Sequence, residues 1–431
     1  RGTRMENVLI ERMTYGIDSL GHTEDGKVVF IPYGAPGDRL NIKITEDKTD
    51  YRRGEIESIV EESGKRRKSP CPNFPECGGC HWLHILPETQ RHEKEEALRF
   101  ILKPLQPEHV YPMEPLPMTG YRNKMELKVA INGDQVILGN YKYRSHDVVS
   151  MKGCIVQCRP NLEVYDRLEE HLNRPENREL AENINTVIIR TLPPQQHCAF
   201  HLKGSPSQRT LESMQSFFDQ TDSLSRLEAH SEMGNHLTLV REKEPFSFMG
   251  RNWRISPNSF FQNNLEGAEA ILHTLLSIYQ ASQHKGKFID LYCGCGTQTF
   301  LLENLFEEVH GVECNISSYQ DALAYQKTRP SSKSRFLCRK AETIFNTPLT
   351  KGVIAALHMN PPRTGISHRV LRGLSGIKPR LITYLSCNPM TFRRDAKAIK
   401  QMGYKLDSVY SFDLFPGTFH METLSVFIRG Q

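Results

Sequence analysis

Residues 288–297 read FIDLYCGCGT, a short apolar run followed by a turn that contains two glycines. The run predicts a β-strand over 288–292, and the residues from Thr299 to Phe306 predict a helix after the turn. Glycines at a strand-to-helix turn let the backbone approach a ligand closely. Ligands of an open parallel sheet bind at the carboxyl ends of its strands, so this turn is a candidate cofactor site.

A carboxylate ends the next predicted strand. Residues 308–312 form that strand, and Glu313 follows it, nineteen residues after Gly294. A carboxylate in this place can accept hydrogen bonds from both ribose hydroxyls of an adenosine. The third glycine of the dinucleotide fingerprint is missing, so the turn favours a different nucleoside cofactor. The alternative interpretation is an ordinary tight turn beside a surface glutamate.

Strand and helix patterns alternate from this turn to the C-terminal end of the sequence. Further strands are predicted at 353–359, 381–385 and 423–428, which indicates an α/β domain with a mainly parallel sheet and crossover helices. The first sixty residues instead show short alternating strands, with Asp25-Gly26 as a hairpin signal, and predict a small β-barrel of the oligonucleotide-binding type. We expect three domains: a barrel (1–62), an α+β central domain (63–255) and a catalytic domain (256–431).

Two motifs directly follow predicted strands at the same sheet edge: NPPRTG at 360–365 and LSCNP at 385–389. The prolines hold the first loop extended and present Asn360. In the second motif, we expect the N-terminus of a following helix to lower the pKa of the Cys387 thiol. Most single cysteines are small buried apolar residues, but a thiol beside a cofactor site is a candidate nucleophile.

A thiolate at this place has a specific chemical use. The C5 atom of uracil is too weak a nucleophile to attack a methyl sulfonium, and a thiolate that adds to C6 makes C5 nucleophilic. A base must then remove the C5 proton, and Glu422, in HMET at 420–423, is the candidate. A surface glutamate at the start of a strand is the alternative. Arg363 stands where methyltransferases of exocyclic amines place an aromatic residue, which argues against amine chemistry.

Three of the eleven cysteines, Cys71, Cys77 and Cys80, lie within ten residues. Gly78-Gly79 leaves room for an ion or cluster, and either Cys154 or Cys158 can supply a fourth sulfur ligand. Four thiolates suit zinc as well as an iron–sulfur cluster. Unligated cysteines are the remaining interpretation, which three thiols at this spacing argue against.

The net charge of +5 is too small to establish a polyanionic partner. Six basic residues nevertheless lie between positions 52 and 68: Arg52, Arg53, Lys65, Arg66, Arg67 and Lys68. They predict either contacts to the phosphates of a nucleic acid or a solvated loop. No stretch reaches the roughly 20 apolar residues of a membrane helix. The first twelve residues do not resemble a signal peptide, so we expect a cytoplasmic protein with no membrane partner.

Taken together, these motifs resemble the RNA uracil-C5 methyltransferase family, in particular its iron–sulfur, TRAM-domain members. Such enzymes make 5-methyluridine in 23S rRNA or in tRNA. The resemblance covers nearly the whole chain and includes YGAPGD at 33–38, YRRGEI at 51–56 and SPNSFFQNN at 256–264. It implies S-adenosyl-L-methionine (SAM) as methyl donor, an RNA partner with 23S rRNA favoured, and a Rossmann-like catalytic domain. We also expect a monomer.

The resemblance also implies roles for particular residues. Cys387 matches the nucleophile, and Glu422, which follows DLFP at 413–416, matches the base. Five positions match the cofactor site: Gln262, Tyr292, Thr297, Glu313 and Asn360. The implied [4Fe–4S] ligands are Cys71, Cys77, Cys80 and Cys154, where Cys154 fits better than Cys158.

Three positions depart from the family pattern. Asn360 replaces the usual Asp, Thr297 replaces a frequent Asn, and Cys295 replaces an apolar residue. The loss of a carboxylate at Asn360 motivates a second hypothesis, an RNA-binding iron–sulfur protein with little turnover. A third hypothesis, methylation of an amino group, rests on the Asn-Pro-Pro sequence.

Overall fold

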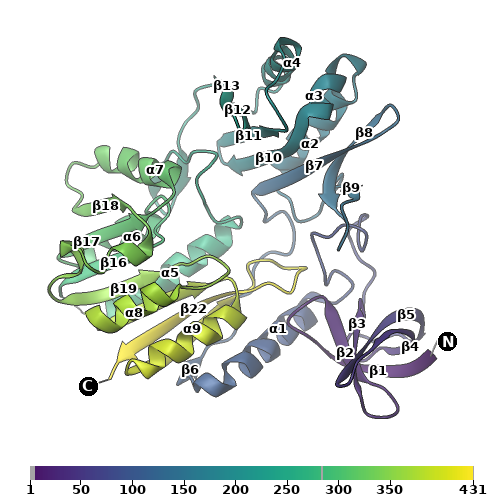
Figure 1. The fold of residues 1–431 in the computed structure, drawn as a ribbon, viewed down its shortest axis with the longest axis horizontal. Coiled ribbons are helices and arrows are strands. Elements are labelled where there is room, and N and C mark those ends of the chain that lie inside the picture. The colour runs from purple at the N-terminus through teal and green to yellow at the C-terminus, as the bar shows by residue number, and fades with distance from the viewer. Residues whose placement is uncertain (1–4, 283–284, 431) are drawn as a thin grey trace. The chain divides into compact units, whose positions relative to one another are not determined.

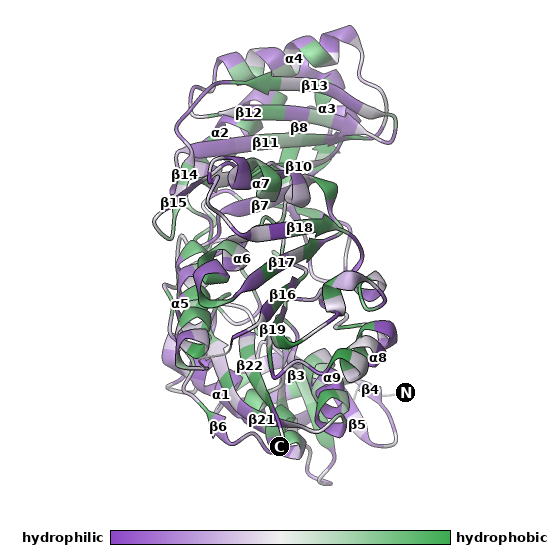
Figure 2. Ribbon diagram, turned by 90° about the vertical axis from the view of Figure 1, so that its left-hand side faces the viewer, coloured by the Kyte–Doolittle hydropathy of each residue, from purple (hydrophilic) through white to green (hydrophobic). Residues whose placement is uncertain are grey.

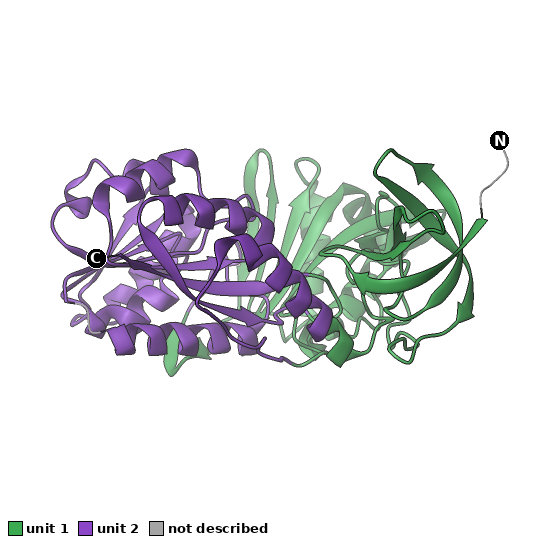
Figure 3. Ribbon diagram, turned by 90° about the horizontal axis from the view of Figure 1, so that it is seen from below, with its two compact units in different colours: residues 1–90, 117–253, 416–419 green, residues 91–116, 254–415, 420–431 purple. Residues whose placement is uncertain are grey.

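The computed structural model describes residues 5–282 and 285–430. The chain divides into two compact units, each built from several segments (Figure 3). Unit 1 comprises the residues up to 90, 117–253 and 416–419, and unit 2 comprises 91–116, 254–415 and the residues from 420 onwards. Both units are therefore discontinuous in sequence.

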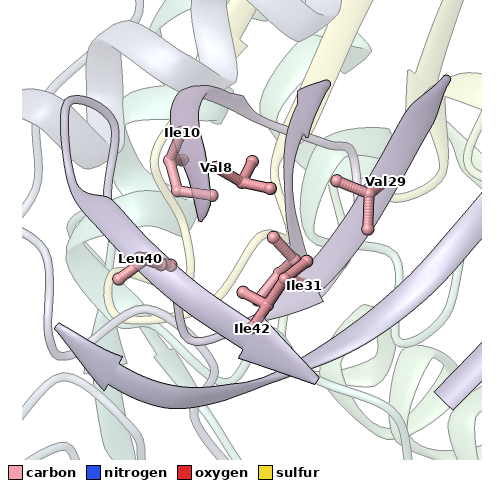
Figure 4. Close-up of a cluster of buried hydrophobic side chains, with 6 residues drawn as sticks. All are labelled: Val8, Ile10, Val29, Ile31, Leu40 and Ile42. Carbon is pink, nitrogen blue, oxygen red and sulfur yellow. The ribbon is translucent and has the colours of Figure 1, made fainter. Parts of the chain in front are cut away.

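The N-terminal strands of unit 1 form a closed barrel in the order β1-β2-β3-β5-β4 (Figure 1). Alternate residues point inward, and six aliphatic side chains fill the interior (Figure 4): Val8, Ile10, Val29, Ile31, Leu40 and Ile42. The predicted hairpin at Asp25-Gly26 is confirmed, because β2 and β3 pair antiparallel around it. The barrel strands are β1 (Met5–Met13), β2 (Asp18–His22), β3 (Val28–Pro32), β4 (Arg39–Asp47) and β5 (Tyr51–Glu61).

The basic residues at 52–68 correct an expectation. Arg52 is buried, and its guanidinium donates to both carboxylate oxygens of Asp25 at 2.8 Å. Arg53 pairs with Asp18 at 2.9 Å, and Arg66 pairs with the buried Asp38 at 2.6 Å. These three arginines therefore bind carboxylates of the barrel and do not project freely from a solvated loop, whereas Lys65 and Lys68 are exposed.

The rest of unit 1 is a mainly antiparallel seven-stranded sheet with helices packed against it. Its order is β13-β12-β11-β10-β7-β8-β9. Figure 2 shows the apolar and polar stretches of α4, which buries Met214, Phe217 and Phe218. The sheet strands are β7 (Lys124–Asn132), β8 (Gln135–Tyr141), β9 (Val148–Ser150), β10 (Ile184–Leu192), β11 (Gln195–Leu202), β12 (Arg226–Ser231) and β13 (Gly234–Val240). The other elements are α2 (Arg159–Leu172), α3 (Arg178–Asn183), α4 (Gln208–Asp219), the 3-10 helix Pro175–Asn177 and the hairpin β14 (Phe246–Phe248) and β15 (Arg251–Trp253).

Unit 2 contains an eight-stranded sheet in the order β18-β17-β16-β19-β20-β22-β21-β6. The first five strands are parallel, whereas β22 is antiparallel to both β20 and β21. The strands are β6 (His109–Val110), β16 (Lys287–Leu291), β17 (Glu308–Glu313), β18 (Ser334–Cys338), β19 (Ile354–Met359), β20 (Leu381–Ser386), β21 (Tyr404–Phe412) and β22 (Glu422–Arg429). The predicted α/β class and mainly parallel sheet are confirmed.

Helices cover both faces of this sheet. The Tyr279 hydroxyl of α5 (Leu265–Ser282) lies 2.7 Å from Thr383 Oγ1, while the Phe392 ring of α9 (Pro389–Gln401) packs edge-on against Tyr384. Neighbouring strand residues point to opposite faces, so α5 and α9 lie on opposite sides of β20. Figure 1 shows α9 on the nearer side, together with α8 (His368–Ile377). The remaining helices are α1 (Pro87–Leu102), α6 (Thr297–Leu302), α7 (Ile316–Lys327) and the 3-10 helices Lys103–Leu105, Glu303–Leu305, Ala341–Thr343 and Pro348–Thr350.

A buried ion pair fastens α1 inside unit 2. Lys94 Nζ donates to Asp413 Oδ1 at 2.6 Å and to the Phe415 carbonyl at 3.3 Å, and the Lys94 side chain is fully buried. We expect Lys94→Ala to lower the free energy of unfolding by about 3–5 kcal/mol, because the buried Asp413 carboxylate loses its cation. Urea denaturation followed by circular dichroism measures this.

Two controls accompany that prediction. The Lys94→Met/Asp413→Leu variant removes both charges and should recover most of the lost stability. Arg99→Ala removes an exposed pair with Glu96 on the same helix and should change stability by less than about 1 kcal/mol. An effect of Lys94→Ala as small as that of Arg99→Ala would contradict the role given to this pair.

Candidate active site

The glycine-rich turn after β16 bends sharply because three of its residues have positive φ. These are Tyr292 (φ 61°), Gly294 (φ 58°) and Gly296 (φ 82°). A Cβ on Gly296 would lie 2.7 Å from the Phe336 ring, so only glycine fits there. Tyr292 adopts the same left-handed region without that freedom, and such backbone conformations concentrate at functional sites.

The structure brings the predicted carboxylate to this turn. Glu313 Oε2 accepts a hydrogen bond from the Gly294 backbone N–H at 2.9 Å, and Oε1 accepts one from Asn315 at 2.7 Å. Each carboxylate oxygen keeps a second lone pair, so acceptance from ribose hydroxyls remains compatible with this geometry. The turn and Glu313 therefore form one site rather than an isolated turn beside a surface glutamate.

The loop at 256–264 is anchored at both ends within unit 2. Ser256 Oγ donates to Asp321 Oδ1 at 2.6 Å, and Asn264 Nδ2 donates to the Leu414 carbonyl at 2.9 Å. Between these anchors, the Phe260 carbonyl lies 4.0 Å from where a Cβ on Gly294 would stand. The loop that contains Gln262 therefore passes close to the glycine-rich turn. Sequence reasoning did not identify Asp321 or Asn264, because their partners are far away in the chain.

Asn360 and Thr297 lie at the same edge of the sheet. The Asn360 N–H donates to the carbonyl of Leu291, the last residue of β16, at 3.3 Å. Thr297 is the first residue of α6, and its hydroxyl donates to the neighbouring Gln298 at 3.0 Å. Both are half-buried. This edge therefore carries polar groups from β16, α6 and the loop after β19.

Cys387 and Glu422 lie at one end of a pair of antiparallel strands. Ser386 at the end of β20 pairs with Thr423, so Cys387 and Glu422 occupy the next step of that ladder. Glu422 is buried, which raises its pKa to about 8, while the charge of Arg363 opposes the shift. A carboxylate with such a pKa is suited to take up a proton near neutral pH.

The pKa of Cys387 differs from the expectation. Burial of the thiol raises it above the ordinary value, and the nearby Glu422 carboxylate raises it further. The opposing group is Arg363, through its charge and a hydrogen bond from its side chain to the Cys387 thiol. The helix α9 does begin at Pro389, but its N-terminus does not outweigh burial.

Arg363 is thus a site residue whose role sequence reasoning missed. Its carbonyl accepts hydrogen bonds from Asn388 Nδ2 at 3.3 Å and from Thr391 Oγ1 at 3.0 Å, which fix it beside the cysteine loop. The only signal in the sequence was its place in a loop that follows a strand of the same sheet.

A buried carboxylate holds the loop that carries Arg363. Asp395 Oδ2 accepts hydrogen bonds from the Ile366 N–H at 2.9 Å and from the Tyr384 hydroxyl at 2.7 Å. Gly365 has φ 77°, and a Cβ there would lie 2.3 Å from the same oxygen. Asp395 of α9 therefore fixes the backbone of the loop that follows Arg363.

The pKa of Glu422 predicts a pH-dependent stability. Because its folded-state pKa of about 8 exceeds the ordinary 4.5, folding favours the protonated acid. This contribution is complete below about pH 4.5 and is lost as the pH rises through 8. Glu422→Gln cannot ionise, so we expect it to match wild type at pH 4 and to be more stable at pH 9, by up to about 5 kcal/mol. Thermal unfolding between pH 4 and 9 measures this, and parallel curves for the two proteins would contradict it.

The cysteines of unit 1 gather around one cavity. Cys71, Cys77, Cys80 and Cys154 all line a cavity of about 30 Å³, and Arg122 lines it as well. Burial raises the pKa of the Cys80 thiol to about 12. Cys158 instead stands at the N-cap of α2. Among the described residues, no group of three or more His, Cys, Asp or Glu side chains is arranged so that it could hold a metal ion.

Comparisons with known proteins cover nearly the whole chain. Residues 3–56 match the TRAM domain, and residues 238–430 match the family described as tRNA (uracil-5-)-methyltransferase. An uncharacterized RNA methyltransferase of Staphylococcus epidermidis is 28% identical over 427 residues, which cover 93% of this chain and 92% of the relative. The chain is an RNA methyltransferase, and its residues 238–430 match the uracil-5 methyltransferase family. The resemblance to uracil-C5 methyltransferases with a TRAM domain is thereby confirmed, and the iron–sulfur cluster stays a prediction.

Two further comparisons agree with this RNA methyltransferase assignment. An uncharacterized RNA methyltransferase of Thermosynechococcus vestitus is 28% identical over 442 residues, covering 95% of this chain and 96% of the relative. The fold matches the Pyrococcus abyssi tRNA (uracil-54, C5)-methyltransferase in complex with S-adenosyl-L-homocysteine, with a TM-score of 0.73 and 22% identity over 98% of this chain and 99% of that one. In the described part of the methyltransferase, no helix is long and apolar enough to cross a membrane.

Proposed function

We propose that this enzyme transfers a methyl group from SAM to C5 of a uridine in RNA, through a covalent bond between Cys387 and C6 of the base. The observation that carries the proposal is the meeting of a thiol, a buried carboxylate and a guanidinium at one end of the strands β20 and β22. This set supplies a nucleophile, a base and a cation beside the site for the cofactor.

The proposed reaction has three steps. The Cys387 thiolate forms a bond to C6, and the C5–C6 π electrons move to make an enolate. C5 then forms a bond to the methyl carbon of SAM, whose bond to sulfur breaks. Glu422 finally takes the C5 proton, the electrons of the C5–H bond restore the double bond, and the thiolate leaves. Arg363 favours the thiolate in the first and last steps through its charge and hydrogen bond.

Residues at the cofactor turn have proposed roles in holding SAM. Glu313 accepts hydrogen bonds from the ribose, and the backbone near Gly294 approaches the nucleoside. Gln262, Tyr292, Thr297 and Asn360 complete the contacts. A nucleoside methyl donor is supported by the P. abyssi enzyme of the same fold, which was solved in complex with S-adenosyl-L-homocysteine.

We favour a uridine of 23S rRNA as the target, because the TRAM domain is combined with the cysteine cavity. A uridine in tRNA is the alternative, since the P. abyssi enzyme acts on tRNA. Mapping of 5-methyluridine in rRNA and tRNA from cells with and without this gene decides between them. The loss of a single 23S rRNA position supports the favoured target, and the loss of a tRNA position supports the alternative.

Transfer of label tests the reaction itself. RNA whose uridines carry tritium at C5 should release tritium to water only when both the enzyme and SAM are present, in step with methyl incorporation. Methylated adenine or guanine without tritium release would instead support amino-group methylation. Binding of RNA with neither release nor incorporation would support the hypothesis of little turnover, which Asn360 motivates.

We further propose that the cysteine cavity holds a [4Fe–4S] cluster with Cys71, Cys77, Cys80 and Cys154 as ligands. All four cysteines line one cavity, and the cationic Arg122, which also lines it, complements the negative charge of a thiolate-ligated cluster. The cluster would act as a structural clamp between distant segments, since Cys154 is 74 residues from Cys80.

Anaerobic purification tests this assignment. We expect four iron and four sulfide per chain and broad absorbance near 400 nm, both lost in Cys80→Ser. Cys158→Ser is the matched control and should keep the full iron content. Zinc in place of iron would correct the identity of the metal, and iron retained in Cys80→Ser would overturn the ligand set.

A further inference from the structure

We infer that the hairpin tip at residues 141–147, between β8 and β9, binds an unpaired nucleotide of the RNA, with Tyr143 stacking on the base and Arg144 contacting the phosphate backbone. The inference deepens the proposed function, because it names a part of the enzyme that reads single-stranded RNA outside the reacting centre. All residues concerned belong to unit 1.

The sequence of the tip is YKYRSHD, which interleaves aromatic and basic residues. Tyr143 is 40% exposed, and Arg144 beside it is exposed as well. Interleaved aromatic rings and cations are the surface that single-stranded nucleic acids require, because bases stack on the rings and phosphates meet the cations.

Cation–π contacts already order these side chains. The Arg144 guanidinium carbon lies 5.1 Å from the centre of the Tyr143 ring, and Lys128 Nζ lies 5.8 Å from the centre of the Tyr141 ring. His146 packs edge-on against Tyr141 at 5.4 Å. A base that stacks on Tyr143 would extend the Arg144–Tyr143 stack. Because these two side chains already contact each other, binding costs little additional side-chain entropy.

The backbone of the tip is pinned to the cysteine loop. Gly78 N–H donates to the Tyr141 carbonyl at 3.0 Å, and Lys142 pairs with Glu76 at 2.8 Å. Within the tip, Lys142 N–H donates to Asp147 at 2.9 Å, and Arg144 takes a positive φ of 55°. The tip is therefore a preformed platform rather than a loose loop, and its exposed side chains are not needed to hold the turn.

Charge distinguishes this tip from the basic residues at 52–68. Arg52, Arg53 and Arg66 are engaged by carboxylates of the barrel. No carboxylate of the described residues forms an ion pair of 4.0 Å or less with the Arg144 guanidinium. An arginine whose charge is not neutralised by a neighbouring carboxylate, held over an exposed tyrosine, has its charge available for a phosphate.

Fluorescence anisotropy of the full-length enzyme tests the inference, with a fluorescein-labelled uridine dodecamer and a twelve-base-pair RNA duplex as probes. We expect Tyr143→Ala to weaken binding of the dodecamer about tenfold, while Tyr143→Phe binds within twofold of wild type, because stacking needs the ring. Arg144→Gln should weaken binding and lower the slope of log affinity against log salt by about one, and Arg144→Lys should restore that slope.

Tyr111→Ala is the matched control, because Tyr111 is 44% exposed but belongs to unit 2. It should leave dodecamer binding unchanged. Equal binding by Tyr143→Ala and wild type, with unchanged circular dichroism, would overturn the inference. Equal loss for duplex and dodecamer would overturn the preference for an unpaired base. These binding measurements do not depend on methyl transfer. If Tyr143→Ala weakens binding as expected but wild-type enzyme releases no tritium, only the proposed reaction is contradicted.

Discussion

Replacing Cys387 with alanine is expected to reduce methyl transfer at least 10⁴-fold, and to remove every covalent complex with RNA that contains 5-fluorouridine. Without the thiol, no bond to C6 forms and C5 does not become nucleophilic by this route. Fluorine at C5 cannot leave as a proton does, so wild-type enzyme with SAM should remain attached to such RNA. Denaturing gel electrophoresis detects the attached complex.

Cys338→Ala provides the control, since Cys338 is an exposed cysteine of the same unit outside the proposed machinery. That variant should form the complex at the wild-type rate. A complex formed by Cys387→Ala would show that another residue is the nucleophile. Methyl transfer by Cys387→Ala at the wild-type rate would exclude the covalent route altogether.

The second large effect is expected from Glu422→Gln, which should trap the enzyme on ordinary RNA. The nucleophile and the methyl donor are intact in this variant, so addition and methylation proceed, but the C5 proton stays in place. We expect turnover to fall by about 10²–10⁴-fold, the usual contribution of a general base, while a complex with unmodified RNA accumulates. Mass spectrometry should find a methylated nucleotide on the peptide that contains Cys387.

Two variants define the outcome of that experiment. Glu308→Gln changes an exposed glutamate of the same unit and should turn over normally. Cys387→Ala/Glu422→Gln should accumulate no complex, because the bond to C6 cannot form. Normal turnover by Glu422→Gln would assign the proton to another base, and a loss of turnover without any complex would place Glu422 before methylation.

The sequence predicted the parts of this enzyme that depend on strand ends. The stretch 381–385 before Cys387 is mostly apolar, and the weaker pattern at 308–312 before Glu313 also marks a strand. Because parallel strands end at one edge of a sheet, the residues that follow such strands lie at the same edge. The barrel was predictable for a similar reason, since its strands alternate. The family motifs then gave these positions their chemistry.

Other features depend on partners that the sequence does not pair. Arg52 reads as a surface cation, yet its partner Asp25 lies 27 residues away on the barrel. The pKa direction at Cys387 follows from burial and from Arg363 and Glu422, which come from two other segments. The helices α2, α3 and α4 were missed. In α2, buried polar residues such as Asn161 and His171 interrupt the apolar stripe.

The division of the chain has a consequence for its synthesis on the ribosome. Unit 2 takes α1 residues and the edge strand β6 from 91–116, long before the rest of its sheet is made, and unit 1 receives residues 416–419 only after residues 254–415 of unit 2 have been made. Neither unit has all of its segments when only the first half of the chain has left the ribosome. A recombinant fragment cut at residue 256 would lack β6 and would leave Asp413 without Lys94. Expression of the catalytic half alone should therefore include 91–116 as a fused segment.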